Sequence, residues 1–447
     1  MLYDQAMVAH FLKEKVMYFS RNRFVRQMMT LQAGSFTGNI IQAVIGIVIA
    51  RLLQPELFGV YALAIGLASI TSLIMGMGIQ EAVSSLLGRA YAQKDREKVE
   101  DLFGFMLKIT FLAALIVIAV LFFMPGIAGK LYGDKLIGIY ASIVAVAAIL
   151  SSLFFSLTYS SFQVTGRIKS LALLVVSDQS LRYGCSLTLV VAGLGVAGAV
   201  SGQLAGAFLT SIFSFFLFLR LKKQESLFPG WGNLVAAARR VDIKKYFGFT
   251  FWVALDRNMG NVFMALPVIL TGIYAVSAEV SFFKLAFGYV NLALSLLGPV
   301  SILLNVRFPK MQVENKSELF RSFKKVSLYS LGLSVLLTVG AIIISPLAFK
   351  ILYGESFLPS VKYVFGLVGY GAFMGIGVGL GPMWRAINKV KVSIIINSII
   401  LAAGIPLGLW LIKNYALWGS VAMVTVWFVV SHLFSYFYIA DHLKHLK

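Results

Sequence analysis

The chain has 447 residues, of which 59% are hydrophobic and 13% are charged, and its formal net charge is +21. Soluble domains hold about 45–50% apolar and about 25% charged residues, so this composition excludes an ordinary globular protein. It indicates a polytopic membrane protein, in which a positive charge first raises the question of topology rather than of nucleic acid.

The chain begins with a basic, amphipathic stretch. Residues 1–30 contain several Lys and Arg residues but no clean apolar run followed by a small-residue cleavage site, so we expect no cleavable signal peptide. We expect this segment, and the similar stretch 231–247, to form helices that lie on the cytoplasmic membrane surface. For both stretches a simple charged connector is the alternative.

Apolar stretches of about 20 residues, the length that crosses a bilayer, then recur to the end of the chain. We predict twelve spans: 31–53, 58–80, 104–125, 136–163, 170–192, 196–219, 246–272, 280–304, 326–348, 360–384, 392–412 and 416–439.

The Lys and Arg residues are unequally divided between the two sides that these spans define. Of the 39, 30 lie in the termini and alternate loops on one side, 6 lie on the other side and 3 lie inside spans. Positive residues concentrate on the cytoplasmic side of membrane proteins, so both termini are predicted to be cytoplasmic. This topology, together with contact with anionic lipids, explains the +21 without nucleic acid as a partner.

Ionisable residues inside the spans are the candidates for function. In the fifth span, Asp178 and Arg182 are four residues apart and can pair on one helix face. In the seventh span, Asp256 and Arg257 are adjacent and point in different directions, and Arg257 shares a stripe with Asn261.

In the eighth span, Lys284 has no acidic residue at helical spacing, and Asn291 follows it by seven residues on the same face. If Asp178 neutralises Arg182, Asp256 can neutralise only one of the two remaining cations. An unpaired cation at bilayer depth is tolerated in a wet cavity or beside an anionic ligand, so we predict a cationic cavity. The alternative for the Asp178–Arg182 pair is a purely structural role.

Uncharged polar residues in the spans give a weaker signal. Asn39 and Gln42 are three residues apart in the first span and share a face, so they are candidates for lining the same cavity. The alternative is a hydrogen bond between helices, which is the commoner role of such residues.

The two halves of the chain echo one another. "KLYGDK" (130–135) and "KILYGES" (350–356) each follow the third span of a six-span unit, and "TGRIK" (165–169) and "INKVK" (387–391) each join the fourth and fifth spans. An even number of spans gives both halves the same orientation. The predicted fold class is therefore an all-α polytopic membrane protein with two six-helix bundles related by a parallel pseudo-two-fold repeat.

These features divide the chain into five parts. They are an interfacial segment (1–30), an N-terminal six-helix bundle (31–219), a cytoplasmic linker with an amphipathic helix (220–245), a C-terminal six-helix bundle (246–440) and a cytoplasmic tail (441–447).

No motif of an enzyme is legible. The chain has no Gly-rich phosphate-binding loop followed by Lys and Ser or Thr, no Cys/His metal spacing and no nucleophile–base arrangement. We expect no enzyme activity, no metal and no cofactor, and the sequence leaves open whether H⁺ or Na⁺ drives transport. The single cysteine, Cys185, is expected to be an ordinary core residue.

The stretch "IARLLQPELFGVYALA" (49–64) resembles the linker between the first two spans of the polysaccharide repeat-unit flippases. These belong to the multidrug/oligosaccharidyl-lipid/polysaccharide exporter superfamily. Arg51, Pro55, Glu56 and Gly59 match the family linker and are interpreted as structural. The twelve spans, the two halves and the basic loop between the second and third spans extend the resemblance over the whole chain.

The resemblance implies a V-shaped, alternating-access transporter of the cytoplasmic (inner) membrane. It would move a polyprenyl-pyrophosphate-linked oligosaccharide to the outer leaflet, as a monomer working near glycosyltransferases and a polymerase. The candidate contacts for the pyrophosphate and sugars, Arg182, Arg257, Lys284, Asn261 and Asn291, depend on the charge argument and not on the family motif.

Two other functions in the same superfamily stay open. A cation-coupled multidrug antiporter would use an acid in a cavity, for which Asp178 or Asp256 could serve. A peptidoglycan lipid flippase is less favoured. Such proteins tend to have fourteen spans and more arginines in the first spans, whereas the first span of this chain has only Arg51.

Overall fold

The computed structural model describes residues 23–76, 79–314 and 316–445, without the side chains of a few residues within these ranges, Asp256 and Arg257 among them. The first interfacial segment falls almost entirely outside the described residues. All regular elements in the described part are helices.

The helices follow one another with short connections. The N-terminal half contains α2 (Arg23–Gly76), α3 (Ile79–Ala92), α4 (Arg96–Tyr132), α5 (Lys135–Val164), α6 (Ile168–Leu189) and α7 (Gly195–Gln224). The short helix α8 (Trp231–Arg240) links it to the C-terminal half, which contains α9 (Lys244–Tyr274), α10 (Ser277–Leu294), α11 (Gly298–Glu314), α12 (Lys316–Leu352), α13 (Val361–Gly366), α14 (Val368–Ala386) and α15 (Val390–His445). Shorter helical elements lie at Val190–Leu194, Ser295–Leu297 and Glu355–Ser360.

Three reversals hidden in long helical stretches, together with the shorter apolar part of α9, bring the count to twelve crossings. Helix α2 is interrupted at Gln54 and α15 at Ala416, and α6 meets α7 at Gly193, each with a positive φ. The flanking segments run back along each other: Gly206 packs on Arg182, and Gly404 and Gly408 pack on Trp427 and Met423. Counted this way, the described residues cross twelve times, although by length and composition only seven helices, or eight with a bent pair, pass as spans.

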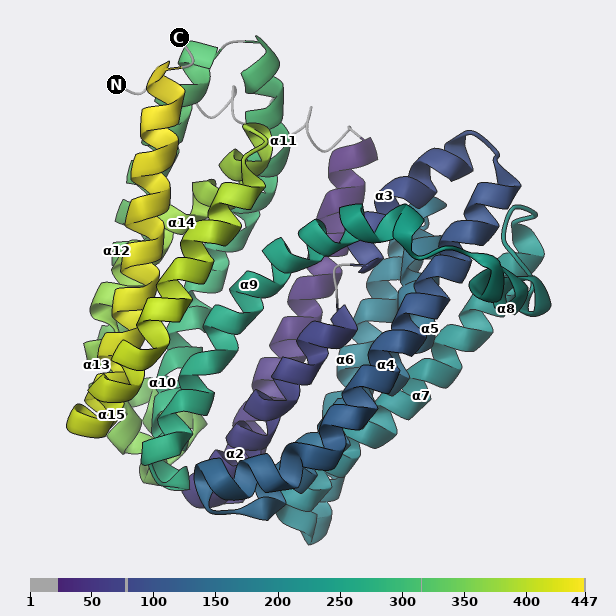
Figure 1. Cartoon of the computed structure of the whole chain (residues 1–447). Coiled ribbons are helices and arrows are strands. Elements are labelled where there is room, and N and C mark those ends of the chain that lie inside the picture. Colours follow the sequence, from purple (N-terminus) through teal and green to yellow (C-terminus); the bar gives the residue numbers. More distant parts are fainter. Residues whose placement is uncertain (1–22, 77–78, 315, 446–447) are drawn as a thin grey trace, which may run out of the picture.

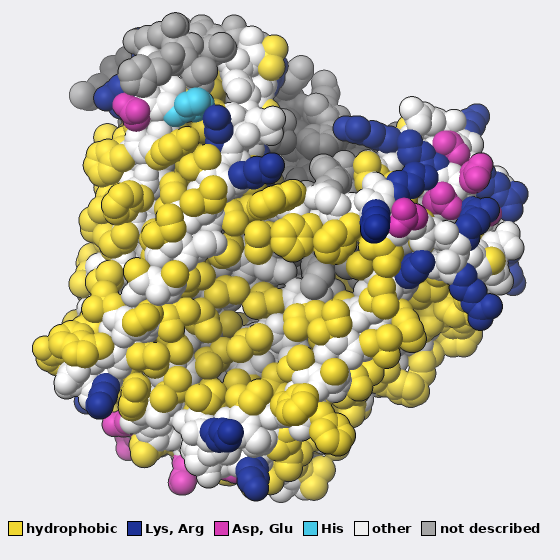
Figure 2. All heavy atoms as spheres, viewed as in Figure 1, with side chains coloured by type: hydrophobic (Ala, Val, Ile, Leu, Met, Phe, Trp, Pro, Cys, Tyr) yellow, Lys and Arg dark blue, Asp and Glu magenta, His cyan; other side chains and the backbone are white. Residues whose placement is uncertain are grey.

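The exterior of the molecule is apolar, as a bilayer requires. Large hydrophobic side chains are exposed along α2, α4, α7, α12 and α15, and they include Phe122 (91%) and Ile343 (72%). Figure 2 shows them as a broad band around the middle of the visible face, with Lys and Arg concentrated at one end. The buried core is apolar as well, and an apolar exterior around an apolar core confirms the predicted all-α membrane fold.

The end rich in Lys and Arg, which we call the basic end, carries α8 and the connections near residues 93–95, 165–167, 225–230 and 387–389. The other end, which we call the opposite end, carries the turns at Gly133 and Gly354 and the α9–α10 connection. Figure 1 shows the two halves meeting at the opposite end and diverging toward the basic end, with α9 crossing from one half to the other.

The internal repeat is visible in the backbone. The "LYG" motifs end α4 and α12, where Gly133 and Gly354 both have positive φ. Gly166 and Asn388, which turn the chain between the fourth and fifth crossings of each half, also share a positive φ. The same unusual conformations at matching points indicate two copies of one six-helix unit.

Candidate functional site

A pocket of about 280 Å³ lies between the two halves, and it contains two of the predicted site residues. Asn261 of α9 and Lys284 of α10 line it together with Ser69 of α2. The other lining residues are Ile65, Gly66, Leu73, Met264, Ala265 and Val268. We call this space the inter-half pocket.

Glycine and small side chains explain why α2 and α9 approach closely here. A Cβ on Gly66 would lie 3.1 Å from Ile269, so glycine lets the two helices pack side by side. Near the basic end of this contact, the side-chain NH₂ group of Asn258 donates a hydrogen bond to the Leu73 carbonyl oxygen at 3.0 Å. The helices are thus held at one depth, and Asn261, one turn from Asn258, faces the pocket.

Among the described residues that line this pocket, Lys284 is the charged one. It lies seven residues into α10, about 10 Å along the helix axis from the opposite end, and its side chain is half-buried. Within the described side chains it has no hydrogen-bond or ion-pair partner. A cation at such depth costs about 2.5–3.5 kcal/mol on insertion scales, and an anion in the pocket would offset part of that cost.

Asp256 and Arg257 lie in α9, on the turn that precedes Asn261 toward the basic end. Their side chains lie outside the described part of the structure. Their predicted roles, as cavity cation and charge-balancing acid, therefore stay predictions.

Asp178 and Arg182 form the predicted ion pair, in the N-terminal half. Arg182 Nε donates to Asp178 Oδ1 at 3.0 Å, and Arg182 Nη2 donates to Ser151 Oγ of α5 at 2.6 Å. Both side chains are largely buried, with 21% and 14% of their surface exposed. Arg182 is thus neutralised in its own half, and neither residue lines the inter-half pocket.

Asn291 is engaged inside the C-terminal half. Its carboxamide oxygen accepts a hydrogen bond from Tyr370 Oη at 2.6 Å, and its NH₂ group donates to the Phe287 carbonyl oxygen at 2.8 Å. Although it shares a helical stripe with Lys284, it does not line the inter-half pocket. The bond from Tyr370 links α10 to α14, and the bond to Phe287 stays within α10.

Asn39 and Gln42 are exposed on the first segment of α2. They lie on a different flank from the exposed apolar stripe of Phe36, Ile40, Val44 and Val48, since residues four apart stay on one side of a helix. The structure therefore separates a polar and an apolar flank on this segment.

Ser69 is the pocket residue that sequence reasoning missed. Its hydroxyl donates to the Gly66 carbonyl oxygen of its own helix at 2.5 Å. A lone serine in an apolar span has no polar neighbour in the sequence that would identify it as a pocket residue.

Among the described residues, no three His, Cys, Asp or Glu side chains come together as a metal site would require.

Comparison with known proteins places this geometry in context. The family model described as "Polysaccharide biosynthesis protein" matches residues 48–362. Stage V sporulation protein B of Bacillus subtilis (strain 168) is 26% identical over 218 residues, which are 46% of this chain and 40% of that protein, so the match spans less than half of the curated relative.

Two solved structures share the fold. The inward-facing conformation of a multidrug resistance MATE family transporter of the MOP superfamily has a TM-score of 0.71 at 15% identity, with 92% of this chain and 95% of that chain covered. Lipid II flippase MurJ in an inward closed conformation has a TM-score of 0.64 at 16% identity, with 92% and 87% covered.

Proposed function

The chain belongs to the polysaccharide biosynthesis protein family, and from this premise we propose that it carries a polyprenyl-pyrophosphate-linked oligosaccharide from the cytoplasmic to the outer leaflet. At the coarser level it is a flippase-type transporter of the MOP superfamily, with a multi-pass membrane fold. The basic end would face the cytoplasm, and the protein would lie in the inner membrane and act as a transporter rather than as an enzyme.

The observation that carries the proposal is Lys284 in the inter-half pocket. The substrate has one strongly anionic part, the pyrophosphate, and it must pass the bilayer between the two halves. A half-buried ammonium at that place, without an acidic partner among the described side chains, offers a counter-charge where the lipid offers none. Asn261 and Ser69 add hydrogen-bonding groups that suit phosphate or sugar oxygens.

The multidrug antiporter is the second candidate, and its fold match to this chain is strong. A coupling acid must be free to exchange a cation. Asp178 is instead bound to Arg182, which favours the flippase over an antiporter that depends on Asp178. The peptidoglycan precursor flippase shares the anionic pyrophosphate chemistry, and glycan analysis of the accumulated lipid distinguishes it.

Replacing Lys284 tests the proposal. We expect Lys284→Ala to reduce export of the glycan at least about tenfold, because the loss of one buried charge–phosphate contact is worth more than 1.4 kcal/mol. Lys284→Arg should retain part of the activity, since it keeps the charge. The measurement is the amount of lipid-linked oligosaccharide left on the cytoplasmic leaflet in cells in which the chain is the sole exporter.

Lys362→Ala is the matched control, because Lys362 lies in α13 at the opposite end, remote from the pocket. It should leave export unchanged. Normal export by a stably inserted Lys284→Ala variant would contradict the proposed role of the pocket. Loss of drug efflux, with glycan export intact, in Asp178→Asn would instead support the antiporter.

A further inference from the structure

At the opposite end, the two halves touch backbone to backbone. Gly59, in the second segment of α2, packs on Ser277 at the start of α10. A Cβ on Gly59 would lie 2.9 Å from the Ser277 Cα and closer still to its carbonyl carbon and oxygen, which no side chain can do without moving the helices apart. This contact therefore exists only because residue 59 is glycine.

A second glycine repeats the arrangement with the halves exchanged. Gly272 of α9 receives Leu63 of α2 and Tyr132 of α4, and a Cβ there would lie 3.0 Å from the Tyr132 ring and closer to the Leu63 methyl group. Leu63 is 2% exposed, and the Tyr132 hydroxyl donates to the Ile269 carbonyl oxygen at 3.3 Å. Each half thus contributes one glycine against which a residue of the other half packs closely.

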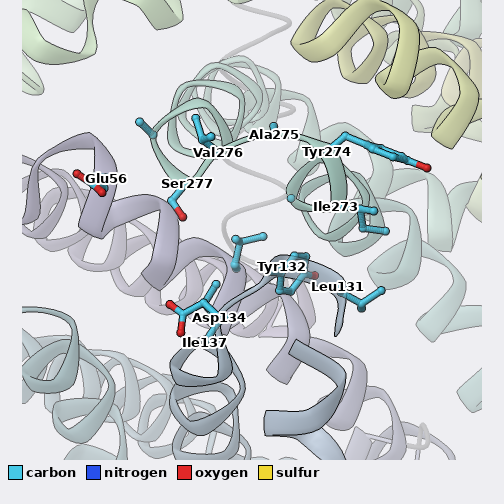
Figure 3. Close-up of a pocket in the computed structure, with 13 residues that line it drawn as sticks. Glu56, Leu131, Tyr132, Asp134, Ile137, Ile273, Tyr274, Ala275, Val276 and Ser277 are labelled. Atoms are coloured by element: carbon cyan, nitrogen blue, oxygen red, sulfur yellow. The ribbon is translucent and has the colours of Figure 1, made fainter. Parts of the chain in front are cut away.

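An open pocket of about 500 Å³ lies over these contacts. Figure 3 shows Glu56 and Asp134 on the N-terminal half and the Ile273–Ser277 turn on the other side of it. At the same end of the molecule, Ser356 Oγ donates to Gln54 Oε1 at 2.8 Å across the two halves. Leu63, Tyr132 and Gly272 are themselves lining residues, so they form part of the wall that separates this pocket from the interior.

We propose that Gly59 and Gly272 form a seal whose closure sets the balance between the state open at the basic end and a state open at the opposite end. The inference goes beyond the proposed function, and it rests on that function only in assuming that the halves alternate. A side chain at either glycine would clash only while the seal is closed. Once the two halves separate, no atom of the other half occupies the space that the side chain needs. Packed interfaces of this kind switch rather than deform gradually.

The seal gives a role to the linker between the first two crossings. Gln54 has φ 61° and ψ 169°, and Pro55 begins the next segment, so the chain reverses there. Gly59 follows one turn later, where the reversed helix meets α10. Pro55 and Gly59 of the linker motif thus serve one geometric purpose.

The experiment measures access of a thiol reagent from outside. Cys185 is the only cysteine, so a Cys185→Ala background carrying Ser69→Cys reports on the inter-half pocket alone. With the seal closed, a membrane-impermeant charged maleimide added to intact cells should label it slowly. We expect Gly59→Val, and more weakly Gly272→Ala, to speed labelling about tenfold, as a shift in a two-state equilibrium would.

Gly126→Val is the matched control. Gly126 lies near the same end of α4, and a Cβ there meets nothing within 4 Å, so labelling should stay slow. If Gly59→Val and Gly272→Ala label as slowly as the parent, the proposal is overturned.

A crosslink that locks the seal closed provides a second test. It does not depend on the glycine variants, which could fold poorly. Gln54→Cys with Ser356→Cys, bridged by a short bifunctional thiol reagent, should hold the seam shut and abolish transport. Transport that continues in the bridged protein contradicts the seal. The labelling assay needs no known substrate, so normal glycan export by Lys284→Ala would refute the proposed function and leave the labelling results standing.

Discussion

At the scale of single residues, the decisive question is which buried charge has a partner. Arg182 is held by Asp178 and by Ser151, so its charge is satisfied within the N-terminal half. Lys284 lies at bilayer depth beside Asn261 and Ser69, which are neutral. The same type of charge is thus paired at one place, whereas at the other it has no partner among the described side chains and is proposed to meet a ligand.

The Asp178–Arg182 pair should behave as a structural element. Asp178→Asn leaves the arginine buried without its counter-charge, and we expect it to lower the free energy of unfolding by about 3 kcal/mol, the usual cost of breaking a buried pair. The double variant Asp178→Asn/Arg182→Gln should recover part of that loss. Thermal unfolding of the purified protein in detergent measures both, and equal stability of parent and Asp178→Asn would contradict the structural role.

At the scale of elements, α8 is docked onto one face of α4. Asp101, Gly104 and Lys108 are spaced along this face: Lys108 Nζ donates to the Val241 carbonyl oxygen at 2.8 Å, and a Cβ on Gly104 would lie 2.6 Å from the Ala237 carbonyl carbon. The hydrogen bond from Arg240 to Asp101, at 2.9 Å, raises the pKa of Arg240. The linker is thus attached to the N-terminal half just before α9 crosses to the other.

Removing the Lys108 ammonium should loosen this attachment. Lys108→Met keeps the apolar stem but deletes the donor to the carbonyl oxygen that follows α8, a loss of about 1 kcal/mol. We expect faster amide hydrogen exchange in residues 231–247 and little change elsewhere. Lys98→Met, on the exposed first turn of α4, is the control, and unchanged exchange in Lys108→Met would show that the contact does not hold α8.

At the scale of the whole molecule, two copies of a six-helix unit meet at one end and diverge at the other (Figure 1). Gly133, Gly166 and Gly193 correspond to Gly354, Asn388 and Ala416, each with positive φ. Because six crossings return the chain to its starting side, both copies have the same orientation. The basic residues of both then accumulate at one end.

This arrangement predicts the sidedness of the protein. In a Cys185→Ala background, Ser356→Cys at the opposite end should react with an impermeant thiol reagent in intact cells. Ser226→Cys, in the connection before α8, should react only after the membrane is permeabilised, because the positive end faces the cytoplasm. The reverse pattern would invert the proposed direction of transport.

By itself, the sequence determined which segments are apolar enough to cross a membrane, which end is basic and that the halves repeat. Partition into the bilayer depends on the composition of each segment, so a span such as 136–163, found within α5, can be recognised without its neighbours. The i, i+4 pairing of Asp178 with Arg182 was predictable for the same reason, since both lie on one helix.

Only the tertiary structure decided which polar groups from different helices meet. Lys284 and Asn291 share a stripe, yet the first faces the inter-half pocket and the second bonds Tyr370. Ser69 and Asn261 come together across almost 200 residues of sequence. Such contacts depend on the rotation and packing of whole helices against one another, which no local spacing encodes.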